Sequence, residues 1–200
     1  MINARAFAQS FVTLVVIMDP IGNVPMFIAL AAGRKSRDRT WLAIQAALAA
    51  GALVTGFALF GGAVLSYLHI SVQSLSIAGG LLLLLVALES FRGQTLPASE
   101  ASNIALVPLA TPLLAGPGAI AAVMVLSTRY SDGPGRAGVV LGIMLTVLVV
   151  GAGLSLAGQI SRLLRPAAIN FLSRVLALLL SAIAVQLIID AVVQLAHARA

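Results

Sequence analysis

The ten residues from Ile17 to Met26, IMDPIGNVPM, decide how this chain folds. They lie inside an apolar run from about Phe7 to Ala32, in which Asp19 is the only charged residue. A helical run of this length can cross the roughly 30 Å hydrocarbon core of a bilayer. Its prolines, however, remove backbone donors and clash with the preceding turn. We therefore predict a first membrane helix that is broken near the bilayer midplane, where irregular backbone is tolerated only against protein or a wet cavity.

A second stretch has the same design. Residues 110–119 are ATPLLAGPGA, and each stretch has two prolines five positions apart with a polar residue, Asp19 or Thr111, before the first of them. The two stretches are 92 positions apart. The prolines expected to break the helices are Pro20, Pro25, Pro112 and Pro117. A single site of this kind can be a simple kink or a close helix contact, but a matched pair favours a functional role.

The composition excludes water as the main solvent of this protein. Of the 200 residues, 60% are apolar and only 9% are charged, with a mean hydropathy of +1.09. A soluble domain carries roughly a quarter of charged residues. A soluble enzyme, a disordered regulator and a nucleic-acid binder are therefore excluded. The chain has no cysteine, and no nucleotide-binding loop, catalytic triad or metal-ligand cluster is visible, so we expect neither an enzyme nor a bound metal or cofactor.

Six apolar runs are long enough to span a membrane. The five beyond the first are about Leu42–Leu68, Val72–Leu88, Asn103–Ser127, Gly138–Gly158 and Ala167–Leu195. We expect one membrane domain over residues 1–200, with one repeat at about 1–100 and a second at about 101–200. Because three crossings reverse the starting side, the second unit must insert upside down, as in many secondary transporters. The predicted fold is all-α: six transmembrane helices as two inverted three-helix repeats, with broken first and fourth helices.

The basic residues predict the orientation of these spans. If the loop between the first two spans is cytoplasmic, eight cations lie on that side: Arg34, Lys35, Arg37, Arg39, Arg92, Arg162, Arg165 and Arg174. The other side holds four: Arg5, Arg129, Arg136 and Arg199. The positive-inside rule then places both termini outside the cytoplasm. Setting this topology accounts for the net charge of +6 without nucleic-acid or specific lipid binding.

The two breaks supply the candidate substrate-binding residues. These are Asp19, Gly22, Asn23, Thr111, Gly116 and Gly118. Asp19 is the only carboxylate at mid-span depth, where a charge is costly and by default functional. It can bind a substrate ammonium, a sodium ion or a coupling proton, or it can cap the second half-helix. Asn23 and Thr111 can offer oxygens to the same ligand or cap the breaks locally, and the glycine-flanked helix starts can offer amides to a carboxylate.

Three residues of the last span are candidates for coupling or gating together with Asp19. Gln186 and Asp190 are four positions apart and share one helix face, with Asp190 close to the outer end. They form a gate or an ion entry, or simply a solvated helix end. Arg174 can meet a substrate carboxylate or extend to the cytoplasmic interface. Close helix contacts are expected at the paired glycines Gly51 and Gly56, Gly61 and Gly62, and Gly79 and Gly80.

These motifs resemble those of the MarC family of bacterial inner-membrane proteins. The resemblance is carried by DPIGNVP at 19–25, SIAGG at 76–80, VPLATPLLAGPG at 107–118 and the segment 170–190, and it covers nearly all of the chain. One departure is the short loop at 92–102, where many relatives have a longer one. The resemblance implies an inner-membrane location and, from SnatA-like members, transport of small neutral amino acids such as glycine and alanine with an ion gradient. The family's plan is also similar to that of the lysine-exporter superfamily.

We therefore predict a secondary transporter of small neutral amino acids or similar metabolites, coupled to a proton or sodium gradient. Its expected partners are the lipid bilayer and a small-molecule substrate, with self-association left open. One alternative is efflux of drugs or metabolites, although the chain has only ten aromatic residues to line a roomy cavity. Another is a non-transporting membrane protein for assembly or signalling, in which the broken helices would have no purpose.

Overall fold

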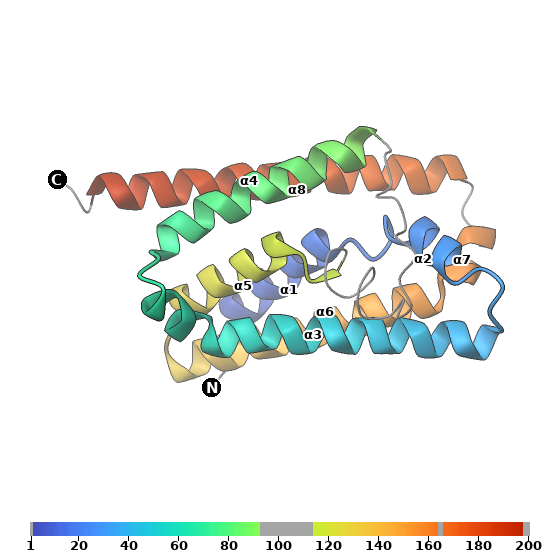
Figure 1. The fold of residues 1–200 in the computed structure, drawn as a ribbon, viewed down its shortest axis with the longest axis horizontal. Helices are drawn as coiled ribbons and strands as arrows, with labels where there is room; N and C mark the ends of the chain where they lie inside the picture. The colour runs from blue at the N-terminus through green and yellow to red at the C-terminus, as the bar shows by residue number, and fades with distance from the viewer. Residues whose placement is uncertain (1, 93–113, 164–165, 198–200) are drawn as a thin grey trace.

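The computed structural model describes residues 2–92, 114–163 and 166–197. In these ranges every regular element is a helix. The helices are α1 (Ala4–Met18), α2 (Val24–Leu30), α3 (Ser36–Tyr67), α4 (Val72–Arg92), α5 (Pro117–Arg129), α6 (Gly133–Ser155), α7 (Ala157–Leu163) and α8 (Pro166–His197). They form a bundle in which α3, α6 and α8 are long and lie roughly along one direction (Figure 1). The predicted all-α class is confirmed.

Four helices, α3, α4, α6 and α8, are long and apolar enough to cross a membrane. The helices beside the two breaks are shorter: α1 has 15 residues and α5 has 13. Large apolar side chains are exposed on the outer faces of the long helices, for example Leu85, Leu148 and Leu178 at 57, 68 and 59%. Water would not tolerate so much exposed apolar surface, whereas lipid does. The helices therefore contact the bilayer directly.

The predicted second, third, fifth and sixth spans correspond to α3, α4, α6 and α8, with one difference, and the first part of the predicted fourth span lies outside the described residues. The fifth run was expected to continue to Gly158, but α6 ends at Ser155 and a separate short helix, α7, begins at Ala157. The backbone N–H of Leu156 still donates to the carbonyl of Ala152 at 2.9 Å, so the chain leaves α6 through a closed turn. Since no proline or charge marks this point, hydropathy alone could not locate the change of direction.

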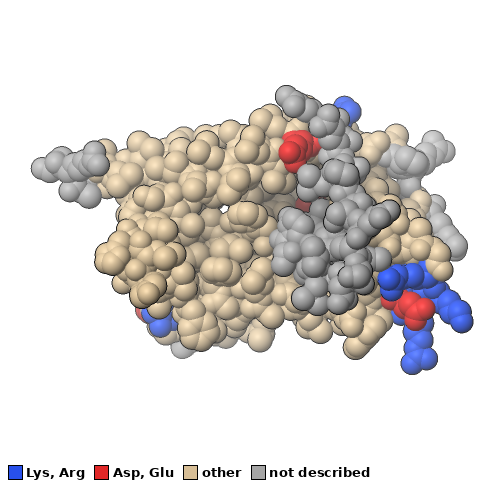
Figure 2. Space-filling view, in the orientation of Figure 1, with Lys and Arg blue, Asp and Glu red and all other residues tan. Residues whose placement is uncertain are grey.

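Each end of the bundle gathers a distinct set of loops. The N-terminus, the α3–α4 loop, the α5–α6 loop and the C-terminal end of α8 lie at one end (Figure 1). Two hydrogen bonds tie this end together, from the N–H of Asn3 to the carbonyl of Pro134 at 3.1 Å and from the Tyr130 hydroxyl to Gln9 at 2.7 Å. The other end holds α2, α7 and the exposed basic residues 34–39, and Figure 2 shows Lys and Arg gathered there. We call these the N-terminal end and the basic end of the bundle.

Glycines allow the closest helix contacts. A β-carbon would meet Val147 of α6 at Gly51, Met124 of α5 at Gly61, Ala121 of α5 at Gly79, and the carbonyl of Ala184 in α8 at Gly80. These four positions confirm the expected packing role. Gly56 and Gly62 have nothing within 4 Å of such a β-carbon, so the expectation was wrong for them. Spacing in sequence does not tell which face of a helix meets a neighbour.

Candidate functional site

The first break begins at Asp19, which ends α1. Its backbone has φ 37 and ψ 71, in the left-handed region, while its N–H still donates to the carbonyl of Val15 at 3.0 Å. Among non-glycine residues, Asp and Asn adopt this conformation at the least cost because their short polar side chains can bond locally. The helix therefore stops at Met18 and the chain turns away, as the sequence predicts.

The Asp19 side chain closes the turn that follows. Its Oδ1 accepts a hydrogen bond from the backbone N–H of Gly22 at 2.8 Å, and its carbonyl accepts one from the N–H of Asn23 at 3.1 Å. A β-carbon on Gly22 would collide with the carboxylate, so only glycine fits beneath it. The carboxylate is half-buried. A single acidic group is thus held in a fixed direction where the membrane helix is interrupted.

Asn23 acts on α1 and not on α2. Its Nδ2 donates to the carbonyl of Met18 at 2.8 Å, which satisfies one of the free carbonyls at the end of α1. Asn23 precedes α2, but its side chain makes no capping bond there. Asp19 does not cap α2 either, since its carboxylate accepts from the turn. Pro25 lies in the first turn of α2, where a proline suits helix initiation, and Pro20 is buried in the turn itself.

The second break is described from residue 114 onward. Gly116 is extended, with φ −64 and ψ 171, and Pro117 is the first residue of α5. Gly118 is buried, and a β-carbon there would meet Leu83 of α4, so this glycine permits close packing of α5 on α4. Thr111 and Pro112 lie outside the described residues.

The two breaks meet in the interior of the bundle. The two helices that flank the breaks, α1 and α5, are in contact with each other. In Figure 1 the C-terminal end of α1 and the N-terminal end of α5 both point into the middle of the bundle. Residues from the two halves of the chain, about 90 positions apart, are thus brought together around Asp19.

The candidates on α8 are placed elsewhere. Ala184 of α8 packs in one cluster with Val16 of α1, close to the first break. Asp190 follows Ala184 by six residues, so at a rise of 1.5 Å per residue it lies about 9 Å beyond Ala184, toward the N-terminal end of the bundle. Arg174 lies about 15 Å from Ala184 in the opposite direction and is exposed. Gln186 and Asp190 do share a face, and Gln186 Nε2 donates to Asp190 Oδ1 at 2.6 Å. The structure therefore brings Gln186 and Asp190 together and keeps both away from Arg174.

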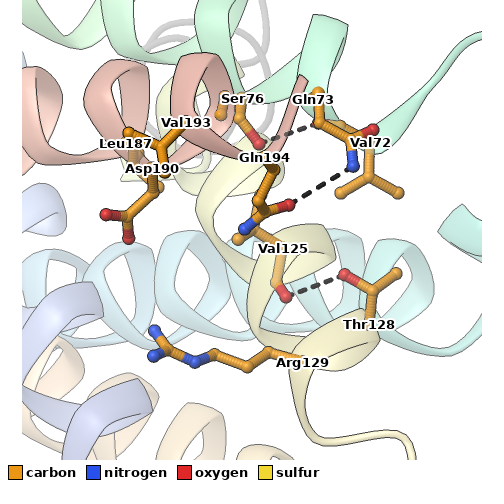
Figure 3. A pocket seen from close by; sticks show the side chains of 11 residues that line it. Val72, Gln73, Ser76, Val125, Thr128, Arg129, Leu187, Asp190, Val193 and Gln194 are labelled. Atoms are coloured by element: carbon orange, nitrogen blue, oxygen red, sulfur yellow. Dashed lines mark hydrogen bonds between the residues drawn. The ribbon is translucent and has the colours of Figure 1, made fainter. Parts of the chain in front are cut away.

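Asp190 lines a cavity that the sequence did not reveal. This cavity lies between α4, α5 and α8 and has a volume of about 530 Å³. Figure 3 shows its walls, which include Gln73 of α4 and Arg129 of α5 beside Asp190. In the sequence Arg129 is simply one of the cations at a span end. Nothing in the spacing of residues 73, 129 and 190 indicates that they meet. Within the described ranges, no three His, Asp or Glu side chains cluster closely enough to hold a metal ion.

Comparisons with known proteins identify the family. Residues 4–196 match the family described as MarC family integral membrane protein. A UPF0056 membrane protein of Methanocaldococcus jannaschii is 39% identical over 199 residues, covering 93% of this chain and 95% of the relative. The UPF0056 inner membrane protein YhgN of Escherichia coli K12 is 32% identical over 192 residues, covering 90% and 93%. No solved structure matches the chain.

These matches extend over nearly the whole chain and include both breaks. The printed name of the Escherichia coli relative places that protein in the inner membrane. The helices described above have the length and composition that such a location requires. The chain is therefore a multi-pass integral membrane protein and belongs to the MarC family.

Proposed function

We propose that this protein is a secondary transporter that moves small neutral amino acids or similar small metabolites, driven by a proton or sodium gradient. The observation that carries the proposal is the interrupted helix at Asp19, where a fixed carboxylate stands at the end of α1, a helix that packs against α5 of the second break. Membrane proteins place ionisable groups at such depth on substrate and ion pathways. Interrupted helices at the midplane are the usual construction of carrier sites.

In this proposal Asp19 receives the cationic partner. That partner is the ammonium of the substrate or the coupling ion, and either is attracted more strongly in the low-dielectric interior than in water. Asn23 supplies a neutral oxygen beside it, and Thr111 is assigned the same role from the sequence alone. The substrate carboxylate is assigned to the backbone amides around Gly116 and Gly118, because the N–H of Gly22 already donates to Asp19.

We also propose that the two halves are inverted repeats. The second span of each half, α3 and α6, pack against each other at Gly51, and the third span of each half, α4 and α8, pack at Gly80. Within each pair the helices run in opposite directions (Figure 1). Equivalent elements that pair in this way fit a pseudo-two-fold axis in the membrane plane. Such an arrangement allows one half to rock against the other around the breaks.

The basic end is assigned to the cytoplasm. It carries the exposed residues Arg34, Lys35, Arg37 and Arg39, whereas the N-terminal end carries fewer cations. By the positive-inside rule both termini then lie outside the cytoplasm.

Uptake into proteoliposomes tests this function. Purified protein is reconstituted, and labelled glycine or alanine is added under a proton gradient and, separately, under a sodium gradient. The native chain is expected to accumulate label under one of them. Asp19→Asn is expected to abolish gradient-driven accumulation while preserving the fold, because asparagine keeps an acceptor for Gly22 and tolerates the left-handed backbone.

The matched control is Asp38→Asn, which neutralises an exposed carboxylate in the first turn of α3 and should transport normally. If the native protein accumulates no amino acid under either gradient, the transport function is wrong. If Asp19→Asn accumulates as much as the native protein, transport does not use Asp19.

A further inference from the structure

The cavity between α4, α5 and α8 opens at the N-terminal end of the bundle, away from Asp19. Its position follows from its lining, which comes from the start of α4, the end of α5 and the last turns of α8. A volume of about 530 Å³ falls within the roughly 300–1,000 Å³ typical of small-molecule pockets. The cavity is therefore large enough for a whole metabolite.

Two opposite charges line this cavity from different helices. Asp190 contributes a half-buried carboxylate from α8, and Arg129 contributes a guanidinium from α5. In Figure 3 the two charged groups extend toward the same side of the cavity. Within the described ranges they form no ion pair with each other. A ligand that carries both charges would therefore find a partner for each of them among the lining residues.

The carboxylate is held in place by its own helix. Gln186, one turn earlier on α8, donates to Asp190 Oδ1 at 2.6 Å. This bond fixes the rotamer of Asp190, so less side-chain entropy is lost when a ligand binds. Oδ2 is the atom that we assign to the ligand.

The rest of the lining is partly polar and partly apolar. Gln73 Nε2 donates to Gln194 Oε1 at 3.3 Å, which links α4 to α8 along one wall. Val125, Leu187 and Val193 add apolar surface. A few convergent polar groups on an apolar lining are the usual design of a metabolite site. The apolar walls suit an uncharged, aliphatic side chain.

We propose that this cavity is a second binding site, distinct from the breaks, for a neutral amino acid in its zwitterionic form. Arg129 contacts the α-carboxylate, Asp190 contacts the α-ammonium, and the aliphatic side chain lies against Val125 and Leu187. This proposal rests on the proposed function in one respect: it takes the ligand of the cavity to be the same solute that the protein transports. At the N-terminal end, the site would hold the solute before it enters or after it leaves the central breaks.

Calorimetric titration of the detergent-purified full chain tests the site. The probes are leucine, its decarboxylated analogue 3-methylbutylamine and its deaminated analogue 4-methylpentanoate. Leucine is expected to bind at least tenfold more tightly than either analogue, because each analogue leaves one charged wall without a partner. Arg129→Gln and Asp190→Asn are each expected to weaken leucine binding at least tenfold. The amide introduced by Asp190→Asn keeps an acceptor for Gln186, so the local helix is retained.

Two controls separate this site from the central one. Arg136→Gln removes an exposed cation at the same end that does not line the cavity, and leucine binding should be unchanged. In the Asp19→Asn chain, whose central site is altered, Arg129→Gln and Asp190→Asn should still weaken leucine binding at least tenfold. Thermal unfolding midpoints of all variants, compared with that of the native chain, show whether each variant is folded.

The outcomes distinguish the two proposals. Leucine binding that is unaffected by Arg129→Gln and Asp190→Asn, or equal binding of the singly charged analogues, overturns the cavity site while transport can still stand. Absence of leucine binding to the native chain also overturns it. If leucine binds and both Arg129→Gln and Asp190→Asn weaken that binding, but proteoliposomes take up no amino acid, the cavity site is supported and the transport function is contradicted.

Discussion

The backbone N–H of Gly22 donates to Oδ1 of Asp19 at 2.8 Å, and a β-carbon on Gly22 would run into that same carboxylate. Position 22 therefore controls where the carboxylate points.

Gly22→Ala should push the Asp19 side chain out of the turn, lower stability by about 1–3 kcal/mol through overpacking, and reduce uptake at least tenfold. Thermal unfolding and proteoliposome uptake measure the two effects. Gly56→Ala, at a position with open space, is the control. Native uptake by Gly22→Ala would show that the direction of the carboxylate is unimportant.

Asn23 joins the turn to the end of α1. Asn23→Ala removes the donor to the carbonyl of Met18, so we expect a loss of about 1 kcal/mol of stability. Asn23→Asp keeps the size of the side chain but replaces the amide donor with a carboxylate, and should also be destabilised. Unfolding midpoints in detergent provide the measurement. If only Asn23→Ala is destabilised, side-chain volume matters there and the hydrogen bond does not.

Gly80 and Gly62 make a matched pair of glycines in long helices. At Gly80 a β-carbon would lie 2.8 Å from the carbonyl of Ala184, and because that atom is backbone it cannot move aside easily. Gly80→Ala should therefore destabilise the α4–α8 contact by about 1–3 kcal/mol. Gly62→Ala meets no atom within 4 Å and should stabilise α3 by up to about 1 kcal/mol, because alanine is the better helix former. Similar unfolding midpoints for both variants would contradict the close packing of α4 on α8.

The orientation can be read directly because the chain has no cysteine. Ser36 lies at the basic end, Ser131 lies at the N-terminal end, and both are exposed. In intact cells a membrane-impermeant maleimide should label Ser131→Cys and not Ser36→Cys, whereas permeabilised cells should show labelling of both. The reverse pattern would place the termini in the cytoplasm.

The sequence is a good guide to the helices and to the first break. Hydropathy locates the long spans because lipid selects apolar length, and the proline after Asp19 marks where α1 stops because it offers no backbone donor. These features are local. The end of α6 at Ser155 carries no such mark. The helix that follows, α7, contacts α2, which belongs to a distant part of the chain.

The candidate site could be predicted only in part for the same reason. Asp19 is recognisable because it is the one carboxylate at mid-span depth. Arg129 is not, since it has the same appearance in sequence as any cation at the end of a span. Its place in the same cavity as Asp190 depends on how α5 and α8 both pack on α4, and no periodicity in these helices encodes that register. Gly118 likewise carries a contact to Leu83 that only the assembled bundle reveals.

The equal lengths of α3 and α8, 32 residues each, have a consequence for the surrounding lipid. Such helices are about 48 Å long and exceed a hydrocarbon core of about 30 Å. They must tilt, extend into the headgroups or thicken the bilayer around them, each at a modest cost per ångström of hydrophobic mismatch. The acyl-chain length of the surrounding lipid therefore influences how far α3 and α8 tilt or extend into the headgroups. Because α3 packs on α6 and α8 packs on α4, a tilt of either long helix would involve its neighbour as well.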